Sequence, residues 1–348
     1  MRFVGMEREV RRVCRASLVI VCSVLAACLS AMAFAADNQP ASPQGQPQSD
    51  VTVDSLSVVR VRTKAVNNAR SMRTLGVQRE GSGVVIDSDG LVLTIGYLVV
   101  EAETVELMTA DGRSFPATVV GYDNNTGFGL LRALQPLPIR PVQIGQSAAV
   151  ADRELVLIVG FDGVAPAYVV SRRQFVGYWE YLLDDAIYTA PATVNWQGAA
   201  LINKEGKLLG VGSLVVGDAL GKGQVPGNLF VPIDLLKPIL GDLISQGRTS
   251  SKPRPWLGVN TQDLQGKLIV TRVSPDSPAD QAGLASGDII VGIRGEQVKG
   301  HSDFYRKLWA SGDAGTDIVL DVLKGTEIRK FEIHSMDREK YLRPKPTY

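Results

Sequence analysis

Short apolar stretches separated by turn sequences dominate the chain from Val51 to about Gly247. Examples are GVVID and LVLT on either side of SDG at 83–94, and ALIN and KLLGVGSLVV on either side of KEG at 200–216. Apolar segments of this length bounded by Asp-Gly and Glu-Gly pairs are typical of β-hairpins. We therefore predict an all-β barrel or sandwich, with one helical stretch at 232–246 near its end.

A second module with a different pattern follows the polar, proline-bearing linker GRTSSKPRP at 247–255. Strand-like segments such as WLGVN, LIVTRV and IIVGI alternate with two short helical segments, ADQAGL and SDFYRKLWAS. This alternation predicts a small α/β domain. The expected organisation is a first domain at 51–250, a second at 251–338, and a tail at 339–348 whose YLRPKPTY sequence predicts no regular structure.

The first 35 residues have the pattern of a secretory signal peptide. Five arginines precede an apolar run at 16–35, which ends in AFA. These features predict cleavage after Ala35 and export to the periplasm. Two alternatives remain open. The run is long enough for a retained inner-membrane anchor, and LAAC at 25–28 resembles the lipidation motif of a lipoprotein with Cys28 as its acceptor.

Composition narrows the chemistry of the remaining chain. All three cysteines lie within the first 28 residues, so the mature chain would form no disulfide. Residues 36–50 are rich in Pro, Gln and Ser, which predicts a disordered linker. Without residues 1–35 the chain carries 32 basic and 34 acidic residues, a balance that does not favour binding to nucleic acid.

Histidine is missing from the first 300 residues and occurs only at His301 and His334. Carboxylates are therefore the main metal ligands left in the first domain, and pairs such as Asp184 and Asp185 have ordinary turn contexts. The sequence predicts neither a metal site nor a cofactor.

Several motifs together resemble the HtrA (DegP-like) family, in which a trypsin-like serine protease domain precedes a PDZ domain. In the first domain they are REGSGVVIDSDGLVLT at 79–94, DGRSFPATVVGYD at 111–123 and GNLFVPIDLLKPIL at 227–240. In the second they are RPWLGV at 254–259 and VSPDSPADQAGLASGDIIVGIRG at 273–295. The resemblance implies a mainly β fold: a trypsin-like double β-barrel followed by an α/β PDZ domain.

The same resemblance places non-catalytic residues at all three positions of the family's Ser-His-Asp triad. Tyr97 stands where the histidine is expected, or Leu98 in an alternative alignment. Gly127 replaces the aspartate and Gln197 replaces the serine. A phenol with a pKa near 10 is a poor general base at neutral pH, and a carboxamide yields no useful nucleophile. A Ser-Lys dyad would need one of the five lysines of this domain beside a reactive serine; these are Lys64, Lys204, Lys207, Lys222 and Lys237.

The PDZ resemblance implies a peptide-binding site. PDZ domains hold a peptide's terminal carboxylate on the backbone N–H groups of a loop, which Leu257, Gly258 and Val259 match here. Phe304 and Leu308, at i and i+4 of the predicted helix, are candidates for lining the side-chain pocket, with core packing as the alternative.

We therefore expect a catalytically inactive, periplasmic HtrA-like protein that binds peptides or unfolded proteins, in a chaperone-like or regulatory role in envelope protein quality control. Its expected partners are protein or peptide C-termini and an active HtrA paralogue. The alternative is an active serine endopeptidase of periplasmic quality control. The resemblance also implies a homotrimer formed through aromatic residues early in the protease domain, although 36–96 contains no aromatic residue.

Overall fold

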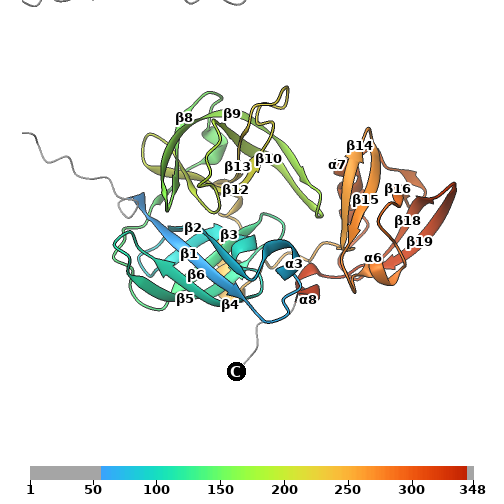
Figure 1. The fold of residues 1–348 in the computed structure, drawn as a ribbon, viewed down its shortest axis with the longest axis horizontal. Helices are drawn as coiled ribbons and strands as arrows, with labels where there is room; N and C mark the ends of the chain where they lie inside the picture. The colour runs from blue at the N-terminus through green and yellow to red at the C-terminus, as the bar shows by residue number, and fades with distance from the viewer. Residues whose placement is uncertain (1–55, 343–348) are drawn as a thin grey trace, which may run out of the picture. The chain divides into compact units, whose positions relative to one another are not determined.

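The computed structural model describes residues 56–342, so the predicted signal peptide, the whole predicted linker, residues 51–55 and the end of the tail lie outside the described residues. Within the described part, the first 80 or so residues build a closed antiparallel barrel (Figure 1). Its strands run around the barrel in the order β1 (Val58–Ala65), β2 (Gln78–Val85), β3 (Leu91–Ile95), β6 (Phe128–Ala133), β5 (Ser114–Tyr122) and β4 (Ala102–Met108). Two short helices, α3 (Met72–Leu75) and α4 (Gly96–Val99), lie in the connections after β1 and β3.

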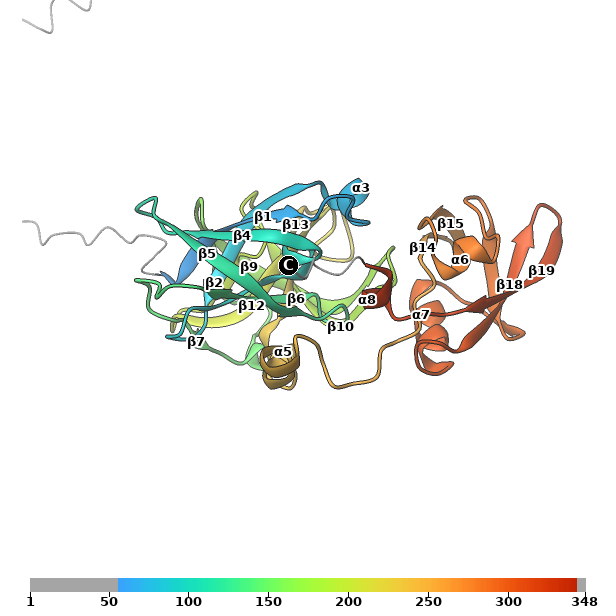
Figure 2. The same cartoon turned by 90° about the horizontal axis from the view of Figure 1, so that it is seen from below.

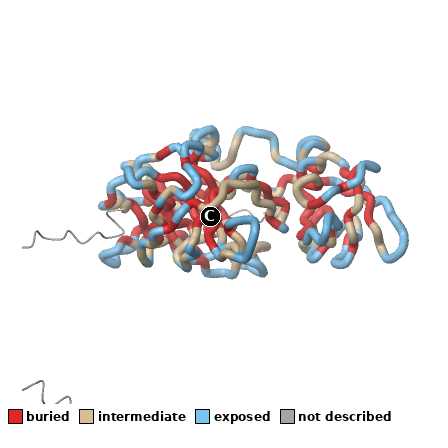
Figure 3. The backbone as a smooth tube through the Cα atoms, turned by 90° about the horizontal axis from the view of Figure 1, so that it is seen from above, coloured by how far each residue is buried: buried red, intermediate tan, exposed pale blue. Residues whose placement is uncertain are grey.

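A second sheet of seven strands follows. Its order is β11 (Ala200–Ile202), β8 (Leu155–Gly160), β9 (Gly163–Gly177), β10 (Tyr181–Ala190), β13 (Gly227–Pro232), β12 (Lys207–Val216) and β7 (Gln143–Ile144). Because β11 also pairs with β12, six of these strands form a second ring. Two 3₁₀ turns, at Ser147–Ala149 and Ile233–Leu235, and helix α5 (Leu240–Gln246) complete this part (Figure 2). Apolar residues of the strands form the buried core. The buried residues are drawn in red along the backbone tube of Figure 3.

The C-terminal module contains a sheet with the order β14 (Val259–Leu264), β15 (Lys267–Val273), β16 (Ile289–Ile293), β18 (Asp317–Lys324) and β19 (Glu327–His334). The short β17 (Glu296–Gln297) pairs with β16. Helix α6 (Pro278–Gln281) begins at Ser277, whose side chain caps it, and α7 (His301–Ala310) packs on β14 and β16. The fold thus has the predicted class, two β-barrels followed by a small α/β domain.

Two local predictions were wrong. The stretch 232–246 is not one helix: Pro232 ends β13, and α5 begins only at Leu240 because Pro238 has no N–H to continue a helix through this segment. The predicted tail also starts with structure. Helix α8 (Arg338–Tyr341) ends in an aromatic ring that lies 4.5 Å from that of Trp256, and this contact orders the first turn.

Candidate functional site

The three positions that the sequence aligns with a Ser-His-Asp triad lie in neighbouring loops of the barrels. Helix α4 carries Tyr97, and the N–H of Gly96 donates a hydrogen bond of 2.6 Å to the carbonyl oxygen of Gly127. The Tyr97 hydroxyl donates to the carbonyl oxygen of Ser213 at 3.1 Å, and its ring centroid lies 6.5 Å from that of Trp196. Burial raises the pKa of the Tyr97 phenol well above its ordinary value. Leu98, the alternative residue, is buried in the barrel core.

The backbone at position 127 has a conformation that favours glycine. Gly127 has a φ of +84°, and a Cβ built there would lie 3.1 Å from the Tyr181 hydroxyl oxygen. That hydroxyl donates to the carbonyl oxygen of Thr126 at 2.6 Å. Asp123, the nearest upstream carboxylate, accepts hydrogen bonds from the N–H and the hydroxyl of Thr126, each at 2.8 Å. Tyr181 therefore occupies the space into which a side chain at position 127 would extend.

The loop around Gln197 is fixed by the backbone. The carbonyl oxygen of Gln197 accepts from the N–H of Ser82 at 2.7 Å, and the N–H of Gly198 donates to Gly212 at 2.9 Å. Gly198 has a φ of +69°, and a Cβ there would come within 2.1 Å of the carbonyl oxygen of Ser82. Only glycine fits so close an approach, so this loop is held in one tight conformation.

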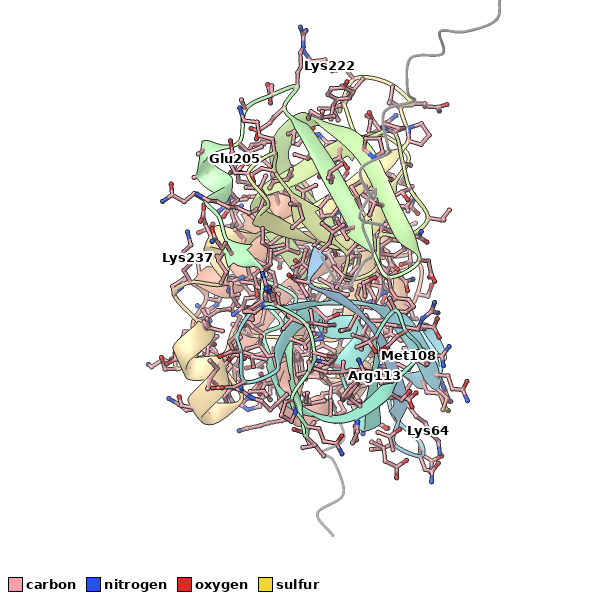
Figure 4. All side chains as sticks on the ribbon, turned by 90° about the vertical axis from the view of Figure 1, so that its left-hand side faces the viewer. Lys64, Met108, Arg113, Glu205, Lys222 and Lys237 are labelled. Atoms are coloured by element: carbon pink, nitrogen blue, oxygen red, sulfur yellow. The ribbon has the colours of Figure 1, made fainter. Side chains whose placement is uncertain are left out.

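The lysines that sequence reasoning offered for a Ser-Lys dyad all lie on the surface. Lys64, Lys222 and Lys237 project outward (Figure 4), and Lys204 and Lys207 are exposed on the turn between β11 and β12. The described residues contain no group of three or more potential metal ligands.

The predicted carboxylate-binding loop of the C-terminal module is already bonded to a carboxylate. The N–H groups of Leu257, Gly258 and Val259 donate to the Glu180 side chain at 3.0, 2.7 and 3.0 Å. Gly258 has a φ of +89°, and a Cβ there would lie 2.3 Å from the Ser277 Cβ. The three N–H donors of this loop thus converge on one acceptor group.

Glu180 lies at the turn between β9 and β10 and is only 7% exposed. Burial raises the pKa of its carboxyl group to about 7, against the opposing effect of the three N–H donors. Its own N–H donates to the Tyr305 hydroxyl at 3.0 Å, and that hydroxyl donates to the carbonyl oxygen of Gly177 at 2.8 Å. Sequence reasoning missed both Glu180 and Tyr305, because no local pattern marks a hairpin tip that bonds to a loop about 77 residues later.

The other predicted binding residues are part of the core. Phe304 and Leu308 are completely buried on α7, which agrees with the core-packing alternative; any role in binding peptide stays a prediction. His301 is half-buried, and its Nε2 lies 2.8 Å from the Thr261 hydroxyl oxygen. His334 is exposed beside Asp317.

Comparison with known proteins agrees with this two-domain architecture. The family model of the trypsin-like peptidase domain matches residues 81–211, and the family model of the PDZ domain matches residues 255–334. A probable periplasmic serine endoprotease, DegP-like, of Marinomonas sp. is 30% identical over 239 residues, which cover 63% of this chain and 49% of the relative. The serine endoprotease DegS of Escherichia coli is 28% identical over 291 residues, covering 72% of this chain and 78% of the relative.

The putative serine protease HhoB of Synechocystis sp. is 30% identical over 71% of this chain and 64% of the relative. Taken with the DegP-like relative, this chain spans about half to two thirds of the length of these curated relatives. Among solved structures, a serine-to-alanine variant of the HtrA-type protease AlgW with a tripeptide has a TM-score of 0.50 and 20% identity, covering 85% of this chain and 99% of that one. This likeness concerns the fold. Between residues 56 and 342, no helix is both long enough and apolar enough to span a membrane.

Proposed function

Since this chain belongs to the HtrA family, in which a trypsin-like peptidase domain is followed by a PDZ domain, we propose that it is a catalytically inactive member that binds peptide C-termini. The observation that carries the first half is the chemistry at the three triad positions. A buried phenol, a glycine and a carboxamide provide neither a proton acceptor at neutral pH nor a nucleophile.

The surroundings of Tyr97 support this proposal. A general base must accept a proton near the working pH, and burial moves the pKa of this phenol further from that range. The hydroxyl is also engaged with Ser213, and Trp196 faces the ring. No histidine is available as a substitute in the barrels, because the two histidines of the chain lie in the PDZ domain.

The backbone of the PDZ loop supports the second half. Three N–H groups that already converge on a carboxylate form a site suited to the terminal carboxylate of a peptide. The N-terminal pattern supports export, so we place the protein in the periplasm, with protein C-termini or an active HtrA paralogue as partners and a homo-oligomer as the assembled form.

Proteolysis is tested with unfolded casein and a fluorophosphonate probe, with an active HtrA protease as the positive control. We expect neither digestion nor labelling. The combined variant Tyr97→His, Gly127→Asp, Gln197→Ser should also stay inactive, since an aspartate at position 127 meets the Tyr181 hydroxyl and requires a φ of +84°. Labelling of the natural protein that is lost when a specific serine is changed would refute the proposal.

Peptide binding is tested with a library of fluorescent decapeptides that end in an apolar residue and a free carboxylate, and with the same library amidated. The free library should bind and the amidated library should not. The Gly258→Glu variant should bind neither, because its side chain places a second carboxylate in the loop. Equal binding of the free and amidated libraries would argue against a PDZ-type site.

A further inference from the structure

The β9–β10 hairpin makes the contacts with the PDZ domain that a bound peptide would make. Its Glu180 carboxylate takes all three N–H donors of the loop, with Gly258 and Val259 both bonded to Oε1. Two residues before it, the carbonyl oxygen of Tyr178 accepts from the N–H of Thr261 on β14 at 3.0 Å. A terminal carboxylate followed by backbone pairing with this strand is how PDZ domains bind peptides.

Apolar contacts between the hairpin and the PDZ domain add to the likeness of the hairpin to a bound peptide. Leu182 of β10 is buried as part of the PDZ core cluster, and Val176 of β9 packs against the same cluster. The Tyr305 hydroxyl on α7 accepts from the N–H of Glu180 and donates to the carbonyl oxygen of Gly177, so it joins the end of β9 and the turn of the hairpin to the helix that forms the other wall of the groove. The hairpin therefore contacts the loop, the strand and the helix of the site.

One feature of this contact is that of a ligand in a site. A buried carboxylate carries a desolvation cost that an apolar side chain at the same place would avoid. An interface that served packing alone would not need it.

Resting on the proposed function, we propose that the Glu180 hairpin is an internal ligand that closes the PDZ site, and that a peptide with a free terminal carboxylate binds only by displacing it. The three N–H donors cannot serve both carboxylates at once, so the two ligands compete. The apparent affinity for a peptide is then the intrinsic affinity multiplied by the fraction of molecules in which the hairpin is displaced.

The test compares the purified protein with its Glu180→Gln variant, using the free-carboxylate decapeptide library in fluorescence anisotropy. In the variant an NH₂ group, which cannot accept a hydrogen bond, replaces one of the two carboxyl oxygens that accept from the loop. This weakens the internal ligand, so peptides should bind the variant at least about 10-fold more tightly. Asp184→Asn is the matched control. Asp184 lies on the same hairpin but is exposed, where it accepts from the exposed Arg306 and from Gln174, so the peptide affinity of this variant should stay within about twofold of that of the natural protein.

A second measurement, hydrogen exchange at the amides of Leu257, Gly258 and Val259, reports displacement without any peptide. These amides should exchange at least about 10-fold faster in Glu180→Gln than in the natural protein, while amides in the core of the first barrel stay unchanged.

Equal peptide affinities for the natural protein and Glu180→Gln would overturn the internal-ligand proposal and leave peptide binding intact. Slow exchange of the loop amides in both proteins, at the rate of the barrel core, would overturn it as well, because the hairpin would then be a fixed part of the fold. If the amides of Glu180→Gln exchange quickly but no free-carboxylate peptide binds, the proposed peptide-binding function fails, and the role of the hairpin as a competitor fails with it.

Discussion

The raised pKa of Glu180 predicts a specific dependence of stability on pH. In the folded protein burial raises the pKa of this carboxyl group from its ordinary 4.5 to about 7. Between these two values the folded protein holds a proton that the unfolded chain has released. The contribution of Glu180 to the free energy of unfolding is therefore fully present below about pH 4.5 and is lost as the pH rises through about 7.

The size of the effect follows from the shift. One pKa unit corresponds to about 1.4 kcal/mol, so the loss across the whole range is on the order of 3 kcal/mol. The neutral Glu180→Gln variant lacks this titration. The difference in unfolding free energy between the natural protein and this variant should thus decrease by about 2 to 3 kcal/mol between pH 5 and pH 8.

Other titrating groups near Glu180 do not produce the same signal. Tyr305 on α7 has a raised pKa because it is buried, so it stays neutral throughout this range. Arg338 on α8 has a lowered pKa for the same reason, yet an arginine remains charged at these pH values. Burial lowers the pKa of His301, so its contribution increases with pH, opposite in sign to that of Glu180; it is present in both proteins and cancels in the difference.

The assay is urea unfolding at pH 5, 6, 7 and 8, followed by the fluorescence of Trp179 beside Glu180 and of Trp256 and Trp309 in the PDZ domain. Asp184→Asn serves as the control and should follow the natural protein at every pH. A difference between the natural protein and Glu180→Gln that is constant from pH 5 to pH 8 would refute the reasoning. It would mean that the three N–H donors outweigh burial and keep the carboxylate ionised throughout.

Three further predictions concern stability, each measured by urea or thermal unfolding. Gly258→Ala should lower the free energy of unfolding by about 3 kcal/mol or more, because its new Cβ would meet Ser277. Gly266→Ala, with a similar φ of +81° but open space around it, should lower it by only about 1 kcal/mol. Equal losses would show that the contact with Ser277 is unimportant. Ser277→Ala should cost about 1 kcal/mol, because it removes the side-chain cap of α6, and an unchanged midpoint would contradict that role. Arg79→Leu should cost about 3 kcal/mol, because this buried guanidinium donates to the carbonyl oxygens of Tyr97 and Val100; a loss below about 0.5 kcal/mol would argue against it.

The sequence was sufficient to predict the domain order and most elements, because hairpins and short helices are encoded locally. The alternation of apolar runs and turns predicted an all-β barrel or sandwich, and the family resemblance selected the double barrel. The apolar i, i+4 pattern predicted α7 within one residue at each end. The failures had local causes that the pattern does not contain. Pro238 breaks a stretch that otherwise has helical spacing, and the ring of Trp256 orders the end of a segment with a tail-like composition.

Only part of the candidate site could be predicted from the sequence. The Leu257-Gly258-Val259 loop was identifiable, because its glycine and apolar neighbours are consecutive. Glu180 was not, because its role depends on a contact between two domains and no residue type in VGYWEYLL indicates it. For Phe304 and Leu308 the sequence allowed two interpretations, because their spacing fits both a binding pocket and a core. Their complete burial agrees with the core.

The β9–β10 hairpin contacts both sites of the proposed function, the turn at position 127 and the PDZ loop. Glu180 bonds to the PDZ loop, while the next residue, Tyr181, reaches the turn that contains Gly127 and donates to Thr126. Trp179 stacks on Tyr181 with ring centroids 5.6 Å apart, between these two contacts. In an active protease the turn at position 127 would be reserved for the carboxylate that orients a histidine. Once that requirement is lost, an aromatic side chain can fill the space and hold a hairpin whose tip then carries a carboxylate for the neighbouring domain. The proposed loss of catalysis and the proposed internal ligand thus share one structural basis, because the Tyr181 hydroxyl lies in the space that a side chain at position 127 would need.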